Sequence, residues 1–271
     1  MGANNSCEIS RLPVDCLSRI ISLTSPRDAC RCSAVSTFFQ SAAAADVVWE
    51  HFLPADLDNI LSETLDKPVF LSKKELYFHL SNEGILVDDG KMILSLDRLT
   101  GAKICMLSVS ATNLVGIIWG WDVRYWQYVP NHDSRFSEVA QLIIVWWLEL
   151  HIALSCKNLT PKTRYAAYFI FKLENDSNGF DLSIETSIAL GDQETWHKVC
   201  LQPRNDTARQ SANNPIRYSQ VRADQWNEVE IGEFINDGEE DDLVSASVEE
   251  TKGLWAKKGL IIYGFEFRPK T

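Results

Sequence analysis

The sequence lacks the segments that would place a chain in or across a membrane. It has no run of about 18 apolar residues, which excludes a membrane-spanning helix. Its start, "MGANNSCEIS", has neither the basic stretch nor the apolar stretch of a secretory signal. Met1-Gly2 with Ser6 fits the N-myristoylation pattern at Gly2, but no basic patch lies beside it, so membrane association is not favoured. We expect a protein of the cytoplasm or the nucleus.

Paired cysteines and an excess of positive charge are also missing. The seven cysteines form an odd, scattered set without a C-x-x-C pair, which argues against a disulfide framework and a zinc site. The chain holds 26 Lys and Arg against 37 Asp and Glu, a formal net charge of −11, and lacks the basic face that phosphate binding requires. We expect free thiols and no nucleic-acid partner.

The acidic excess belongs to one segment of the chain. Eleven acidic residues and no Lys or Arg lie between Asp224 and Glu250, which leaves 26 charges of each sign elsewhere. We expect a solvated loop around "NDGEEDD" with acidic strand edges. An acidic recognition surface and a metal site are the alternatives.

Catalytic signatures are absent as well. The sequence contains no G-x-G-x-x-G, P-loop, H-E-x-x-H or G-x-S-x-G motif, and its five histidines are isolated. These absences predict a non-catalytic protein, with no catalytic residues, no bound metal and no cofactor.

What the sequence does contain is, first, a small helical module at residues 11–54, for which we expect three short helices. Leu17, Ile20 and Ile21 share one face, as an amphipathic helix requires. A second helix starts at "SPRD", where Ser25 can accept a hydrogen bond from a backbone N–H and Pro26 suits the first helical position. So short a module lies near the lower size limit for independent folding, and its leftover apolar face needs a partner.

The order of signals in this module is specific. A Leu-Pro pair is followed by "LSRIISLTSPRDACRCSAVS", and a terminal Trp follows "AAAADVV". This order resembles an F-box, the motif by which substrate receptors dock onto the Skp adaptor of a cullin-RING ubiquitin ligase. The resemblance implies that eight residues bind the adaptor: Leu12, Pro13, Leu17, Ile20, Ile21, Pro26, Val35 and Trp49. The alternative is a helical cap with no partner.

The character of the sequence changes after a helical connector at residues 55–81. Residues 82–271 contain about ten short runs rich in Ile, Val, Tyr, Phe and Trp, separated by polar turns. This pattern predicts a jelly-roll-like β-sandwich. With a tail at residues 1–10, the expected fold class is an α+β multidomain chain in which a small three-helix F-box precedes an all-β sandwich domain.

Four segments of the strand-rich region carry a second resemblance: "SATNLVGIIWGWDVRYWQY", "SRFSEVAQLIIVWWLEL", "TRYAAYFIFKLENDSNGF" and "WNEVEIGEF". In order and spacing they resemble the phloem protein 2 family, whose tobacco member is a lectin for glycans that contain N-acetylglucosamine. The resemblance covers about residues 82–269. Together with the N-terminal module, the architecture is similar to the plant F-box proteins of the phloem protein 2 type.

The nine tryptophans supply candidates for a sugar-binding wall. A sugar offers a face of C–H bonds that aromatic rings can cover, while carboxylates hold its hydroxyls. In the family's lectins two tryptophans seven positions apart form this wall, and Trp119 and Trp126 match that spacing. Trp121 either enlarges the platform or blocks it. The resemblance also implies acids from a late strand, for which the candidates are Glu228, Glu230 and Glu233.

Core packing is the alternative for these tryptophans, because aromatic residues in strands are most often buried. We expect packing for the adjacent pair Trp146 and Trp147 in "LIIVWWLEL". For Trp126 core packing and sugar contact remain equally open.

These observations predict the substrate-recognition subunit of a Skp-cullin-F-box ubiquitin ligase, with a lectin-like domain that binds N-acetylglucosamine-containing glycans or glycoproteins. Such a subunit supplies only binding energy, because it raises the effective concentration of activated ubiquitin near the substrate's lysines. Two alternatives stay open: an F-box receptor whose sandwich binds a protein surface without any sugar, and a free lectin with a vestigial F-box.

Overall fold

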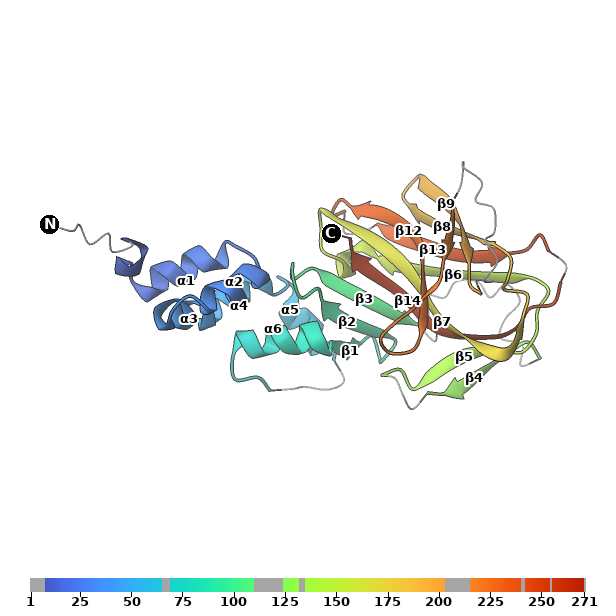
Figure 1. The fold of residues 1–271 in the computed structure, drawn as a ribbon, viewed down its shortest axis with the longest axis horizontal. Coiled ribbons are helices and arrows are strands. Elements are labelled where there is room, and N and C mark those ends of the chain that lie inside the picture. The colour runs from blue at the N-terminus through green and yellow to red at the C-terminus, as the bar shows by residue number, and fades with distance from the viewer. Residues whose placement is uncertain are drawn as a thin grey trace. The chain divides into compact units, whose positions relative to one another are not determined.

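The computed structural model describes residues 8–64, 69–109, 124–131, 135–202, 215–239, 242–253 and 255–270. The chain divides into two compact units. The first comprises Met1–Ile85 together with Leu94–Lys103, and the second comprises Leu86–Ile93 together with Ile104–Thr271. Each unit is described by itself below, with the element labels of Figure 1.

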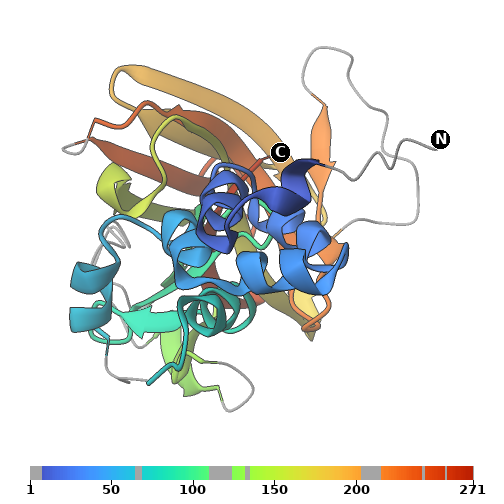
Figure 2. The same cartoon turned by 90° about the vertical axis from the view of Figure 1, so that its left-hand side faces the viewer.

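The first unit is mainly helical (Figures 1 and 2). Within the described residues it contains a short 3₁₀ turn, Glu8–Arg11, and six helices: α1 (Val14–Ser22), α2 (Pro26–Ser33), α3 (Thr37–Ala44), α4 (Asp46–Phe52), α5 (Leu57–Ser62) and α6 (Lys73–Asn82). Figure 2 shows the helices drawn in blue gathered into one bundle. No helix within the described ranges is long and apolar enough to cross a membrane.

Residues 11–54 form four helices where the sequence predicts three. As predicted, Ser25 caps α2, because its hydroxyl accepts a hydrogen bond from the Asp28 N–H at 3.1 Å. The expected second helix ends early because Ser36 adopts an extended conformation and caps a new helix, accepting from the Phe39 N–H at 3.3 Å. Polar side chains that compete for backbone donors thus divide one predicted helix into two.

Trp49 organises the core of the helical unit. Its indole N–H donates to the backbone oxygen of Ala43 at 2.8 Å, and its ring lies 5.1 Å from Tyr77 and 5.2 Å from Phe78 between centroids. Tyr77 in turn donates to the backbone oxygen of Asp97 at 3.2 Å. The segment predicted as a connector is therefore packed onto the helices of residues 11–54.

The strands of the described residues form two sheets, of nine and five strands (Figure 1). The larger sheet has the order β1-β2-β3-β14-β7-β12-β11, with β5 also paired to β14 and β4 paired to β5. The smaller sheet has the order β10-β9-β8-β13-β6. The strand bounds are β1 (Ile85–Val87), β2 (Met92–Leu96), β3 (Lys103–Ser108), β4 (Trp126–Pro130), β5 (Glu138–Leu142), β6 (Leu148–Ser155), β7 (Thr163–Asn178), β8 (Ile184–Leu190), β9 (Gln193–Cys200), β10 (Ile216–Tyr218), β11 (Gln220–Val221), β12 (Asn227–Asn236), β13 (Leu243–Glu250) and β14 (Lys258–Pro269).

The two sheets face each other across an aromatic and aliphatic core, which confirms the predicted β-sandwich. In the larger sheet, the ring of Phe169 lies 5.3 Å from that of Phe171 and 5.2 Å from that of Phe265. Thr186 in β8 donates to the backbone oxygen of Ile231 in β12 at 3.1 Å, joining one sheet to the other. In the smaller sheet, β6 alternates buried and half-buried residues, as expected for a strand with one face on the core. In the larger sheet, β7 has buried residues on both faces.

Trp146 and Trp147 differ from the sequence-based expectation. Both side chains are exposed, and Trp147 retains 62% of its accessible surface. The reason is that β6 begins only at Leu148, so the two tryptophans lie in the preceding segment, where strand alternation does not bury either of them. The packing role predicted for this pair is therefore wrong.

Candidate functional site

The predicted adaptor-binding residues fall into two groups. Four side chains are buried in the helical core: Leu17, Ile21, Pro26 and Trp49. Four reach the surface at least in part: Leu12, Pro13, Ile20 and Val35. The buried side chains have no surface to offer a partner, so we assign them to holding the module together. The surface side chains, among which Val35 is 67% exposed, are the ones available for docking.

The predicted sugar-binding wall is described only at one end. Trp119 and Trp121 lie outside the described residues, as does Gly2. Trp126 is the first residue of β4, pairs with Leu142 in β5, and is only 4% exposed. A ring buried this deeply offers no face to a sugar, so its described position corresponds to the packing alternative.

The three predicted acids lie on β12. The strand register places Glu228 opposite Ile170 and Glu230 opposite Tyr168, and a bulge follows between Glu230 and Gly232. Glu266 on β14 lies opposite the other side of Tyr168. Residues from three neighbouring strands thus meet on the face of the larger sheet that points away from the smaller sheet.

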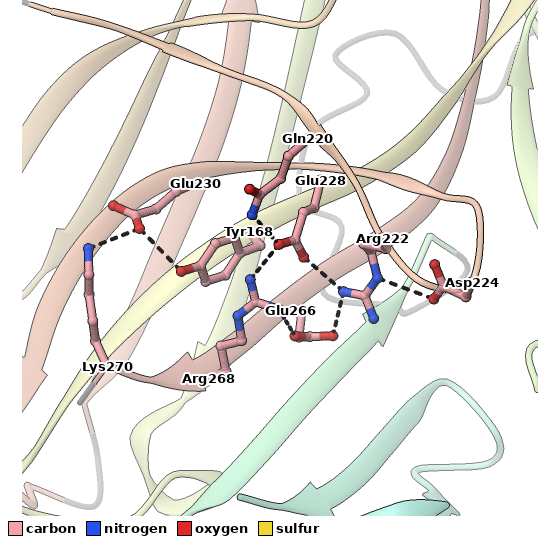
Figure 3. Close-up of polar contacts among 9 residues, drawn as sticks. All are labelled: Tyr168, Gln220, Arg222, Asp224, Glu228, Glu230, Glu266, Arg268 and Lys270. Atoms are coloured by element: carbon pink, nitrogen blue, oxygen red, sulfur yellow. Dashed lines mark hydrogen bonds and ion pairs between the residues drawn. The ribbon is translucent and has the colours of Figure 1, made fainter.

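These residues form a network of ion pairs on that face (Figure 3). Glu228 accepts hydrogen bonds from Arg268 at 2.7 Å, from Gln220 at 2.8 Å and from Arg222 at 3.1 Å. Glu266 accepts from the same two guanidinium groups, at 3.0 Å from Arg268 and 3.1 Å from Arg222. Two arginines therefore bridge two carboxylates, and we call these four side chains the arginine–glutamate cluster.

Glu230 and Glu233 continue the network at its edge. Glu230 accepts from the Tyr168 hydroxyl at 3.2 Å and from Lys270 at 2.9 Å, as Figure 3 shows. Glu233 accepts from the same lysine at 2.5 Å. The guanidinium carbon of Arg268 lies 3.6 Å from the Tyr168 ring centroid, a cation–π contact that adds to its ion pairs.

The electrostatics of the cluster favour the charged forms. Burial disfavours the Glu228 carboxylate, but hydrogen bonds from Arg268 and Gln220 and the charge of Arg222 outweigh it, so the Glu228 pKa is lowered. Burial likewise opposes the charge on Arg268, and Glu228 and Glu266 overcome this effect to raise the Arg268 pKa. Glu228 and Arg268 therefore stay ionised near neutral pH and satisfy one another.

Sequence patterns therefore predict the three acids as neighbours but miss the residues that hold them. Arg222 and Arg268 come from segments separated from β12 by a turn and by a whole strand, respectively. No local pattern around either arginine indicates its partner. As described, the carboxylates of Glu228 and Glu230 are occupied by protein groups.

Comparison with known proteins supports both halves of the chain. A family model described as Phloem protein 2 matches residues 103–269, and one described as F-box-like matches residues 9–54. The chain is 41% identical over 270 residues to F-box protein PP2-B10 of Arabidopsis thaliana, covering 98% of this chain and 96% of that one. It is 40% identical over 261 residues to the Arabidopsis thaliana F-box protein At2g02240, covering 95% and 79%.

Proposed function

Because the chain belongs to the F-box proteins of the phloem protein 2 type, we propose that it is the substrate-recognition subunit of a Skp-cullin-F-box ubiquitin ligase. The helical module docks the chain on the Skp adaptor, and the β-sandwich selects the substrate. The chain acts by proximity, since holding a substrate near activated ubiquitin raises the effective concentration of the reacting groups without any catalytic residue of its own.

The observation that carries the docking half is a set of exposed apolar side chains on a well-packed helical module. Ile20, Leu23 and Val35 are all exposed on or beside α1 and α2, while Leu17 and Ile21 fill the core beneath them. Several exposed apolar residues on so small a module are typical of a surface that a partner covers.

Titration of the full chain with a purified plant Skp adaptor tests this half. We expect the double variant Ile20→Asp, Val35→Asp to bind at least about tenfold more weakly, because two charges would be buried in the interface. Leu182→Asp is the matched control, since Leu182 is an equally exposed apolar residue in the sandwich. Equal binding by the double variant would contradict docking through this face, and no binding by the wild type would indicate a vestigial F-box.

We propose further that the sandwich binds N-acetylglucosamine-containing glycans, with Trp119 as the ring that covers the sugar face. Family membership supports this assignment, and the alternative is recognition of a protein surface without sugar. Calorimetric titration of the full chain with chitin oligomers should give heat that Trp119→Ala reduces at least about tenfold. Heat that Trp119→Ala leaves unchanged would remove Trp119 from the site, and no heat with any oligomer would favour the protein-binding alternative.

A further inference from the structure

The outward face of the smaller sheet carries rows of small side chains between larger ones. The strand register sets His151, Ser247, Ser187 and Trp196 in one row across β6, β13, β8 and β9. The two central serines bond to each other, with 2.9 Å between hydroxyl oxygens. Neighbouring strands lie about 4.8 Å apart, so His151 and Trp196 stand roughly 14 Å apart at the two ends of this row. The two serines between them are buried.

The next row along the strands is smaller still. It contains Ala153, Ser245 and Ala189, followed by Glu194 on β9. Two rows with Ala and Ser at their centre thus follow each other along the strand direction. Beside them, Trp196 is 46% exposed on a regular strand, in contrast to the buried tryptophan of β4.

On the other side of the row that contains Ser187 and Ser247 lies a row of mainly acidic residues. Across the same four strands, the register aligns Glu149, Glu249, Glu185 and Lys198. Glu185 pairs with Lys252 at 2.6 Å, and Glu149 lies 2.9 Å from His151. These partners reach in from the surface, and such exposed pairs are worth only about 0–1 kcal/mol, so a ligand hydroxyl can replace them at little cost.

A cavity of about 270 Å³ opens at this row. Its lining includes Glu185, Glu249, Lys198 and Lys252, with Trp255 as an aromatic wall. The cavity is at the small end of the range of ligand pockets, which run from about 300 to 1,000 Å³, and so suits a single ring of a longer ligand.

The Trp255 wall is held in place by its surroundings. Its indole N–H donates to the backbone oxygen of Gly179 at 3.3 Å, and Lys257 lies 5.0 Å from its ring centroid. Gly253 passes so close beneath the ring that a Cβ there would lie 1.9 Å from it. Lys257 is fully buried and pairs with Glu250, which holds the lysine in place beside the Trp255 ring. The wall is therefore preorganised rather than adaptable.

We propose that this cavity and the adjoining outward face of β9 form a binding site for a neutral oligosaccharide, built from residues other than Trp119, Trp121 and Trp126. Trp196 and Trp255 cover sugar rings, and the carboxylates of Glu185 and Glu249 accept hydrogen bonds from hydroxyls. The inference rests on the proposed role of the sandwich as a glycan reader, and it adds a second site for the same class of ligand.

Charge distribution selects this ligand class over others. An anionic ligand would meet the row of Glu149, Glu249 and Glu185, whereas a cationic ligand would meet Lys198 and Lys252. A ligand without net charge but rich in hydroxyls avoids both penalties and uses both kinds of partner. Within the described part of the chain, no group of His, Cys, Asp and Glu is arranged to hold a metal ion.

A glycan array probed with the full chain tests the proposal. The wild type should bind neutral oligosaccharides, and Trp196→Ala, Trp255→Ala and Gly253→Ala should each reduce the signal at least about tenfold. Tyr218→Ala is the matched control, because Tyr218 is an exposed aromatic residue on the adjoining strand β10, where it pairs with Cys200 outside both rows. Thermal unfolding of each variant identifies any loss that is due to misfolding.

Hydroxyl-radical footprinting of the wild type gives a second measurement that needs no variant. The neutral glycan that binds best should protect Trp196 and Trp255 from oxidation. Binding that survives all three substitutions and leaves Trp196 and Trp255 unprotected, but is lost in Trp119→Ala, would overturn this site and leave the proposed function standing. Binding of only acidic glycans, or of none, would overturn this site and the glycan half of the proposed function together, and adaptor docking would be unaffected.

Discussion

The two outward faces of the sandwich use the same residue types to opposite effect. On the larger sheet, Glu228 is only 6% exposed, and two arginines bind it and Glu266 together. On the smaller sheet, Glu185 is 36% exposed and meets a single lysine that is itself largely in solvent. Both faces have carboxylates on adjacent strands. On the larger sheet two arginines bind all the oxygens of Glu228 and Glu266, whereas on the smaller sheet a single exposed lysine binds both oxygens of Glu185.

The difference shows why acids alone do not define a recognition site. A planar guanidinium group donates in a fixed fork and can bridge two carboxylates, which closes the arginine–glutamate cluster. A lysine on a flexible stem provides a point charge that moves aside. The neighbours also differ, because Ser187 and Ser247 bond to each other on the smaller sheet, whereas Arg268 lies over the Tyr168 ring on the larger one.

Removal of Arg268 should have the largest effect on this comparison. Arg268→Ala leaves Glu228 and Glu266 with one guanidinium group between two largely buried carboxylates. Breaking a buried pair from one side costs about 3–5 kcal/mol, because an uncompensated charge stays behind. Urea unfolding of the full chain, followed by the circular dichroism of the sheets, measures the loss. A cost below about 1 kcal/mol would mean that the cluster contributes no more to stability than the exposed Glu185–Lys252 pair.

The Glu228 carboxylate should give a smaller, pH-dependent effect. Its pKa in the folded chain is held below the usual 4.5, so its contribution to stability is complete above that value and is lost as the pH falls through the lowered pKa. At pH 7, Glu228→Gln should reduce the free energy of unfolding by about 2 kcal/mol, as for other hydrogen bonds to charged groups.

Urea titrations of wild type and Glu228→Gln between pH 7 and pH 3 measure this dependence. The difference between their free energies of unfolding should stay constant down to about pH 4.5 and narrow below it, as the wild-type carboxylate becomes protonated. A difference that stays constant over this range would show that Glu228 contributes by shape and packing rather than by charge.

How much of this could be predicted from the sequence depends on the range of the interactions involved. Local signals were sufficient for the Ser25 cap, because the serine and the N–H group that it binds lie within one turn of each other. The extra helix after Ser36 was missed because a serine can continue a helix or cap the next one, and only tertiary packing decides.

The sites depend on pairings between distant segments. Glu249 stands beside both Glu149 and Glu185 because β13 pairs with β6 on one side and with β8 on the other. A register shift of one residue would send each of these side chains to the opposite face, and no local pattern fixes that register. The spacing of Trp119 and Trp126 predicted a common wall, yet burial of Trp126 is set by the pairing of β4 with β5.

The smallest expected effect, at Lys252, sharpens the comparison most directly. Lys252→Ala removes the partner of Glu185 but leaves that carboxylate largely in water, so the free energy of unfolding should change by no more than about 0.5 kcal/mol. The same urea experiment used for Arg268→Ala measures it. If the loss approached that of Arg268→Ala, the carboxylates of the smaller sheet would contribute as much to the fold as those of the larger one, and Glu185 could not exchange its lysine for a ligand. A negligible loss fits an ion pair that keeps a recognition carboxylate charged and available while contributing almost nothing to the fold.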